Sequence, residues 1–176
     1  MKKIVFFSHG LSANGIETFL VNVLRKIDKT KYDITVIIAI DEGVYCLHEK
    51  TVADMGIRVI HAGNLDAPKK KLDYIKNVKK ILACCDCFLM PSLFEGLPFS
   101  LIEAQAAGLR CIVSDVVTKE ADVGLIEYFS LENGAKKWAE FINRELDEPR
   151  KSADENKLRQ FDISHTVRQL EEIYDR

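Results

Sequence analysis

The amino-acid sequence predicts an α/β fold built on a doubly wound, parallel sheet of six strands. Two observations support this prediction. Short apolar runs alternate along the chain with stretches of helical periodicity, and glycines stand where expected helices give way to strands. Such an alternation folds with right-handed crossovers into a Rossmann-like sheet, with a strand order close to 3-2-1-4-5-6. We expect all 176 residues to form this single domain.

The expected strands are short runs rich in β-branched, aromatic and apolar residues, which suits strands that are covered on both faces. They are Ile4–Phe7, Ile34–Ile40, Arg58–His61, Cys87–Met90, Arg110–Ser114 and Leu125–Phe129.

The expected helices lie between these strands. Apolar residues from Ile16 to Ile27 recur at helical spacing, which predicts an amphipathic helix that packs on the sheet. Gly56 and Gly108 each stand where a left-handed C-cap is needed before a strand. The further helices are Val44–Met55, Leu72–Cys84, Phe99–Ala107, Asn133–Leu146 and Thr166–Tyr174, the last with Ser164 as candidate N-cap.

Four side chains are assigned to the core, and one charged stretch is assigned to the surface. Trp138, Phe141 and Ile142 lie at helical spacing and are interpreted as core residues. Cys111 lies inside a strand and is interpreted as core rather than as a nucleophile. The segment Glu148–Gln160 is charged and nearly devoid of apolar residues, so we expect an exposed connection or a solvated helix there.

Composition excludes several classes of protein. The balance of 25 basic and 27 acidic residues gives a net charge of −2, so no whole-molecule basic field attracts nucleic acid. The longest apolar run, Ile34–Ile40, is far too short to cross a bilayer, and the apolar core of a secretory signal is missing after Lys2 and Lys3. We therefore expect a cytoplasmic protein.

The cysteines are interpreted as small buried hydrophobes in a reducing compartment. Their number, five, is odd. The cluster Cys84-Cys85-Asp86-Cys87 could hold a soft metal, but no second group of ligands accompanies it, so a structural role is favoured and no metal site is expected.

The predicted topology locates the ligand before any motif is considered. In open α/β sheets, ligands bind at the carboxyl ends of the strands where the strand order reverses. Here the strands Ile4–Phe7 and Cys87–Met90 flank that point. The loops that follow them, Ser8–Glu17 and Pro91–Pro98, are expected to face each other.

Common nucleotide-binding signatures are absent from these loops. Gly10 and Gly15 have the spacing that opens a P-loop, but Ile16-Glu17 stands where Lys-Ser/Thr must hold phosphate and magnesium. The GxGxxG fingerprint of dinucleotide enzymes is missing as well. No DxD motif is present to hold a divalent metal on a nucleotide diphosphate, so any sugar-nucleotide chemistry is expected to be metal-independent and without a cofactor.

The segment Pro91–Asp115 is the most informative part of the sequence. A strand runs into a turn and then into a helix with Pro98 near its first position, and the amides of Gly96 and Leu97 are expected to point into the crevice. A helix N-terminus of this kind attracts phosphate. Glu95 precedes it and Glu103 follows inside the helix, and both carboxylates can accept hydrogen bonds from sugar hydroxyls. The alternative is that Glu95 caps the helix and Glu103 is an ordinary surface residue.

This segment closely resembles the E-x7-E signature of the retaining glycosyltransferases of family 4, which have the two-domain GT-B fold. The resemblance implies a nucleotide-sugar donor, linked to UDP or GDP, and a glycan or lipid-linked acceptor in surface polysaccharide synthesis. It implies that Glu95 contacts the donor sugar, that the amides of Gly96 and Leu97 bind the diphosphate, and that Glu103 binds the ribose.

The loop after the first strand is similar to another element of the same family. Asn14-Gly15-Ile16-Glu17, which follows Gly10, resembles the family's glycine-glycine-x-glutamate loop, with Asn14 in place of one glycine. The resemblance implies that Gly10, Asn14, Gly15 and Glu17 help to admit acceptor and diphosphate.

The resemblance is discontinuous along the chain. Met1–Asn64 look like the first half of the family's amino-terminal domain, and Asp73–Arg176 look like the second half of its carboxyl-terminal domain. The family's histidine near the reacting sugar, and the arginine and lysine that neutralise the diphosphate, fall in the missing middle. The candidate replacements are His9 and Lys119, each with an ordinary surface role as the alternative.

Two hypotheses about activity remain open. In the first, the protein transfers a sugar, and a homodimer supplies the missing cation and covers the crevice. In the alternative, a truncated, non-catalytic relative binds a nucleotide sugar or a partner without turnover.

A lysine-rich helix offers a second kind of contact. Lysines between Lys69 and Lys80 decorate a stretch whose apolar face is Leu72, Ile75, Val78 and Leu82. Such a helix can rest peripherally on anionic lipid. The favoured alternative is a crossover helix with its apolar face on the sheet and its lysines in water.

Overall fold

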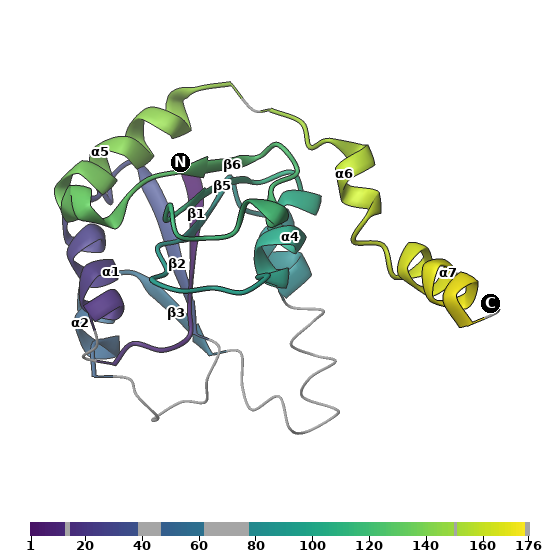
Figure 1. Ribbon diagram of the computed structural model, residues 1–176. Coiled ribbons are helices and arrows are strands. Elements are labelled where there is room, and N and C mark those ends of the chain that lie inside the picture. Colours follow the sequence, from purple (N-terminus) through teal and green to yellow (C-terminus); the bar gives the residue numbers. More distant parts are fainter. Residues whose placement is uncertain (13–14, 39–46, 62–77, 150, 175–176) are drawn as a thin grey trace.

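Six parallel strands form one sheet in the order β3-β2-β1-β4-β5-β6 (Figure 1). The computed structural model describes residues 1–12, 15–38, 47–61, 78–149 and 151–174. This parallel sheet and its strand order confirm the predicted fold class and the predicted order 3-2-1-4-5-6. The strands are β1 (Lys2–Ser8), β2 (Tyr32–Ile38), β3 (Arg58–His61), β4 (Cys87–Met90), β5 (Arg110–Val113) and β6 (Ile126–Tyr128).

β1 is the strand at which the direction of winding reverses. It pairs with β2 on one side, where Ile4 lies opposite Ile34, and with β4 on the other, where Ile4 lies opposite Cys87. Ile4, Val5 and Phe6 are fully buried, as expected of a strand with a neighbour on each side and helices on both faces.

The helices cover the two faces of this sheet unequally. α1, α2 and α5 pack on one face, and α4 together with the helical residues 78–83 packs on the other (Figure 1). The assigned helices are α1 (Gly15–Lys26), α2 (Glu49–Asp54), α4 (Phe99–Ala106), α5 (Gly134–Asp147), α6 (Glu155–Arg159) and α7 (Ile163–Tyr174), with short 3₁₀ turns η1 (Lys119–Ala121) and η2 (Leu131–Asn133).

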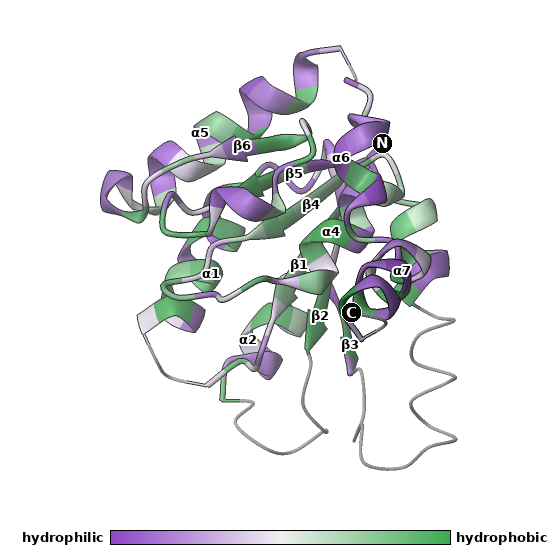
Figure 2. Ribbon diagram, turned by 45° about the vertical axis from the view of Figure 1, so that its right-hand side comes forward, coloured by the Kyte–Doolittle hydropathy of each residue, from purple (hydrophilic) through white to green (hydrophobic). Residues whose placement is uncertain are grey.

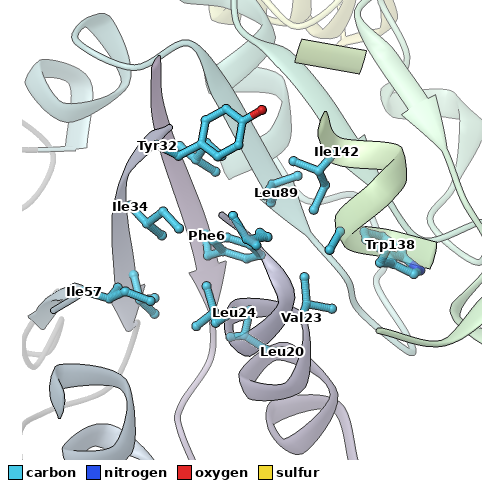
Figure 3. Packing of buried hydrophobic residues seen from close by; sticks show 14 of the residues in the cluster. Phe6, Leu20, Val23, Leu24, Tyr32, Ile34, Ile57, Leu89, Trp138 and Ile142 are labelled. Carbon is cyan, nitrogen blue, oxygen red and sulfur yellow. The ribbon is translucent and has the colours of Figure 1, made fainter. Parts of the chain in front are cut away.

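The larger core lies between β1, β2, α1 and α5, where apolar side chains interlock (Figure 3). Trp138 of α5 is completely buried, meets the ring of Phe19 edge-on at 5.8 Å, and donates its indole N–H to the carbonyl of Ser130 at 3.0 Å. Phe141 and Ile142 are buried beside it. The three predicted core residues of this helix are confirmed.

The second face of the sheet is held together by one buried amide. Gln105 of α4 is fully buried, donates to the carbonyl of Ala121 at 2.7 Å, and accepts from the backbone N–H of Val123 at 3.0 Å. These bonds tie α4 to the connection between β5 and β6. Nothing in the helical periodicity distinguishes this glutamine from a surface residue.

Several predicted boundaries differ from the structure. β2 begins at Tyr32 rather than Ile34, and its expected end at Ile40 lies outside the described residues. The helix expected over Val44–Met55 was predicted too long, because residues 47–48 form a turn. α2 begins only at Glu49. Gly56 and Gly108 both have φ of +76°, so the two predicted left-handed C-caps are confirmed.

The carboxyl-terminal part of the chain extends away from the sheet (Figure 1). α7 starts at Ile163, earlier than the predicted Thr166, because the Asp162 carboxylate accepts from the N–H of Ser164 at 2.7 Å. Ser164 therefore lies inside the helix, and its prediction as N-cap was wrong. α6 falls within the charged stretch Glu148–Gln160 and buries none of its residues, as a solvated helix should.

The central strands of the sheet consist mostly of hydrophobic residues, whereas the outer helices contain many hydrophilic ones (Figure 2). Within the described residues, no helix has the length and apolar character needed to span a membrane.

Replacing Gln105 with leucine tests the buried amide. Gln105→Leu gives a side chain of similar size but leaves the Ala121 carbonyl and the Val123 N–H unpaired. Since each buried backbone group without a partner costs about 1–3 kcal/mol, we expect the free energy of unfolding in urea to fall by about 2–6 kcal/mol. Gln160→Leu, at an exposed position, is the matched control and should change it by less than about 0.5 kcal/mol. Equal stability of the two variants would contradict this assignment.

Candidate functional site

A cavity of about 460 Å³ opens at the carboxyl ends of β1 and β4. It lies at the point where the strand order reverses, as the topology predicts. Its lining comes from the end of β1 and the loop after it, from the first turns of α1, and from the loop after β4. The lining residues are Phe7, Ser8, His9, Ile16, Glu17, Leu20, Pro91, Ser92, Leu93, Phe94 and Glu95.

The loop after β1 is held by hydrogen bonds close to the sheet. The hydroxyl of Ser8 donates to the carbonyl of Gly10 at 2.7 Å, and the Leu11 carbonyl accepts from the N–H of His48 at 2.8 Å. Leu11 is completely buried. The loop is therefore anchored on both sides of His9, whose side chain is exposed and lines the cavity.

The loop after β4 is fixed by two serines. Ser114, fully buried at the end of β5, donates its hydroxyl to the carbonyl of Ser92. Ser92 in turn donates its own hydroxyl to Oε1 of Glu95 at 2.7 Å. This bond turns the Glu95 carboxylate toward its own loop and the cavity. The alternative role of Glu95 as a helix cap is not observed.

α4 begins directly after this loop without a side-chain cap. Pro98 is its N-cap, one position before the N1 place that the sequence suggested, and no capping side chain bonds to the first turn in the part of the chain that the structure describes. The first N–H groups of this helix are consequently open to an anion. Gly96 and Leu97, whose amides were expected to serve a diphosphate, are exposed between Glu95 and α4.

The structure brings part of the predicted site together. His9, Glu17 and Glu95 line one cavity although they are far apart in sequence. Glu103 is exposed on α4 and does not line it, and Lys119 is exposed in η1 after β5 and does not line it. Gly10 is buried and Gly15 opens α1, whereas Asn14 lies outside the described residues.

Two lining residues were missed by the sequence analysis. Leu93 and Phe94 are large apolar side chains that are 62% and 87% exposed at the mouth of the cavity. A pair of exposed apolar residues beside two carboxylates is the signal that could have identified them, but only after the loop had been placed.

The lysine-rich segment is described only at its end. Residues 69–77 lie outside the described residues. Val78 and Leu82 are buried against the second face of the sheet, and Lys79 and Lys80 are exposed. This part of the helix has the packing expected of a crossover helix.

Burial disfavours the thiolate form of three cysteines in the described segments, whereas Cys84 is exposed and is not the buried side chain that the sequence predicted. Burial raises the pKa of Cys87 and Cys111 well above the ordinary range, and it raises the pKa of Cys85 to about 11. Cys111 lies in the core, as predicted. Among the described residues, no group of three histidine, cysteine or acidic side chains is arranged to hold a metal ion.

The fold and the position of the cavity define a Rossmann-like α/β protein with a cavity at the switch point of its sheet. Residues 2–147 match the family model for glycosyl transferases of group 1. The chain belongs to this family, and its sheet is that of the GT-B glycosyltransferases.

Individual relatives share parts of the chain. A capsular polysaccharide biosynthesis glycosyltransferase, CapH, from Staphylococcus aureus is 31% identical over 161 residues, which are 88% of this chain and 42% of CapH. The Escherichia coli UDP-Gal:alpha-D-GlcNAc-diphosphoundecaprenol alpha-1,3-galactosyltransferase is 42% identical over 62 residues, 32% of this chain and 16% of that enzyme. The chain thus spans less than half the length of these relatives.

Solved structures show the same fold at lower identity. Sucrose-phosphate synthase from Thermosynechococcus elongatus superimposes with a TM-score of 0.64 at 20% identity, over 99% of this chain and 45% of the synthase chain. This likeness establishes the fold.

Alkylation tests the state of the thiols. At pH 8, iodoacetamide should label exposed Cys84 in the native protein and leave Cys111 unlabelled, because the thiolate is the reactive form and burial disfavours it. The labelling rate of Cys85 should rise about tenfold per pH unit as the pH approaches its pKa of about 11. Peptide mapping by mass spectrometry reads out each site, with guanidinium-unfolded protein as control. Rapid labelling of native Cys111 would contradict its assignment to the core.

Proposed function

We propose that the protein binds a nucleotide-sugar donor, linked to UDP or GDP, at the carboxyl ends of β1 and β4. The observation that carries this proposal is the cavity at that point, which Glu95 lines directly before the uncapped N-terminus of α4. In this arrangement the sugar lies beside Glu95, and the diphosphate lies over the amides of Gly96, Leu97 and the first turn of α4.

The ribose takes its place outside the cavity in this proposal. Glu103 is exposed on α4, where its carboxylate can accept hydrogen bonds from two neighbouring hydroxyls. The nucleotide then runs along α4, with its phosphates at the helix N-terminus and its nucleoside toward the middle of the helix. The resemblance of Glu95 and Glu103 to the family's paired glutamates supports this order.

The proposed reaction is a metal-independent transfer of the sugar, with retention of configuration, to a glycan or lipid-linked acceptor. The names of the relatives support the class of acceptor, since one acts on a diphosphoundecaprenol-linked sugar and another serves capsular polysaccharide biosynthesis. The loop of Gly10, Asn14, Gly15 and Glu17 is proposed to admit the acceptor.

Departure of the diphosphate needs positive charge, because electrostatic stabilisation of the leaving group is usually the largest catalytic contribution. His9 is the basic side chain among the lining residues of the cavity, so we assign it this task within the chain. Lys119 supplies this positive charge only if the nucleotide extends past β5. A second copy of the chain is the other proposed source of a cation, and it would also cover the open cavity.

The resemblance of residues 1–64 and 73–176 to two different half-domains belongs to the same proposal. Together they supply the strands of one complete sheet. A binding module without turnover is the alternative function. Release of UDP or GDP, followed by chromatography, separates the two: a catalyst passes the sugar to an acceptor hydroxyl or to water and accumulates the nucleoside diphosphate, and a binding module does not.

Calorimetric titration tests the donor site. Glu103→Ala should weaken the binding of UDP or GDP by about tenfold or more, since a hydrogen bond to a charged group contributes about 1.5–3 kcal/mol. Glu140→Ala, an exposed glutamate of α5, is the matched control and should bind as the wild type does. The proposal fails if neither nucleotide, free or sugar-linked, binds to the wild-type protein.

A further inference from the structure

Glu17 stands in an unusual environment for a carboxylate. Its side chain is only 6% exposed, and it lines the cavity from the first turn of α1. Its Oε2 atom is buried and has no hydrogen-bond partner among the described residues. Buried polar atoms are nearly always bonded, so a carboxylate that lines a cavity and has an unbonded oxygen indicates that a ligand supplies the missing donor.

The charge of the cavity restricts what that ligand can be. Two carboxylates, Glu17 and Glu95, line it together with one basic side chain, His9. Oε1 of Glu95 already accepts from Ser92, whereas Oε2 of Glu17 accepts nothing. A phosphate inside this cavity would meet two like charges, and a neutral group with several hydroxyls would meet two acceptors.

The apolar part of the lining narrows the choice further. Leu93 and Phe94 are exposed apolar residues of the lining, and Phe7, Ile16 and Leu20 add further apolar surface to it. A hexose matches this combination, because its ring has an apolar C–H face and an edge of hydroxyl donors. The volume of about 460 Å³ falls within the range of small-molecule pockets.

We propose that Glu17 is a sugar-binding residue: its carboxylate accepts a hydrogen bond from a hydroxyl of a neutral hexose whose apolar face lies against Phe94. The inference rests on the proposed function for the source of the sugar, which is the donor's hexose or the terminal hexose of the acceptor. In this arrangement the cavity binds the sugar, and the phosphates lie at the N-terminus of α4. Glu17 thereby has a role that the resemblance of its loop to the family does not provide.

The removal of the Glu17 charge separates a binding role from a structural one. Glu17→Gln keeps the shape of the side chain and removes the charge of a buried carboxylate whose Oε2 has no hydrogen-bond partner among the described residues. The melting temperature of the unliganded variant should therefore be unchanged or raised, because burying an unpaired charge is destabilising. A structural carboxylate would instead show a lowered melting temperature. Glu140→Gln on the surface of α5 is the matched control.

The binding measurement uses UDP, GDP, UDP-glucose, UDP-galactose and GDP-mannose in calorimetry, and the methyl glycosides of the same hexoses in saturation-transfer NMR. Glu17→Gln and Phe94→Ala should each reduce the hexose-dependent part of the affinity by at least about threefold and leave the affinity for UDP and GDP unchanged. Phe94 is 87% exposed, so its replacement does not disturb the core. Loss confined to the nucleotide sugars identifies the donor hexose, and loss confined to the methyl glycosides identifies the acceptor hexose.

Failure of this inference differs from failure of the proposed function. Unchanged hexose binding in Glu17→Gln, or an equal loss for free and sugar-linked nucleotides, overturns the role of Glu17. Absence of any hexose binding to the wild type overturns it as well. Methyl glycoside binding that depends on Glu17, without binding of any nucleotide, supports this inference and refutes the nucleotide-sugar site.

Discussion

The parallel pairing of β1 with β4 is the interaction on which the site depends. β1 is the first strand of the chain and forms ladders on both sides, so the strands that follow it build one half of the sheet and β4 starts the other. Because parallel strands end at the same edge, the loops after β1 and β4 are forced to lie side by side. Without this pairing, Glu17 and Glu95 would have no common cavity, and the sheet would divide between β1 and β4 into two halves.

The site has two electrostatic environments, and each suits a different part of a sugar nucleotide. The cavity itself presents carboxylates and an aromatic ring, whereas the uncapped start of α4 beside it presents free N–H groups. The first environment suits hydroxyls and the second suits phosphate. A single loop of the chain, from Ser92 to Pro98, joins these two environments, and Ser114 fixes it from β5. The geometry thus accounts for an acidic cavity in a protein proposed to bind an anionic donor.

The sequence allowed the strand order to be predicted because each strand is a short apolar run and each crossover is a helix with a readable period. Gly56 and Gly108 marked helix ends reliably, since only a residue without a Cβ adopts φ of +76° at no cost. Trp138 was assigned to the core from helical spacing alone.

Features that depend on tertiary contacts were out of reach. Gln105 looks like any polar residue of a helix until Ala121 and Val123 are placed beside it. Ser164 resembled an N-cap, but its own N–H donates to Asp162, two residues earlier, and the helix starts sooner. The burial of Glu17 follows from how α1 packs against the sheet, and sequence reasoning gave it only the general role of its loop. Long-range neighbours decided the cases of Gln105 and Glu17, whereas a local competitor decided that of Ser164.

The location of the ligand tests the account most directly. Backbone amide resonances of uniformly ¹⁵N-labelled protein, followed during titration with UDP-glucose and GDP-mannose, report where the nucleotide sugar binds. We predict that the largest changes in amide chemical shift fall in the segments 8–17 and 92–103, on both sides of the cavity. A second cavity of about 310 Å³ lies at the opposite edge of the sheet, lined by Lys3, Arg58 and Lys80 among others. Shifts concentrated there, with the carboxyl ends of β1 and β4 unaffected, would contradict the account.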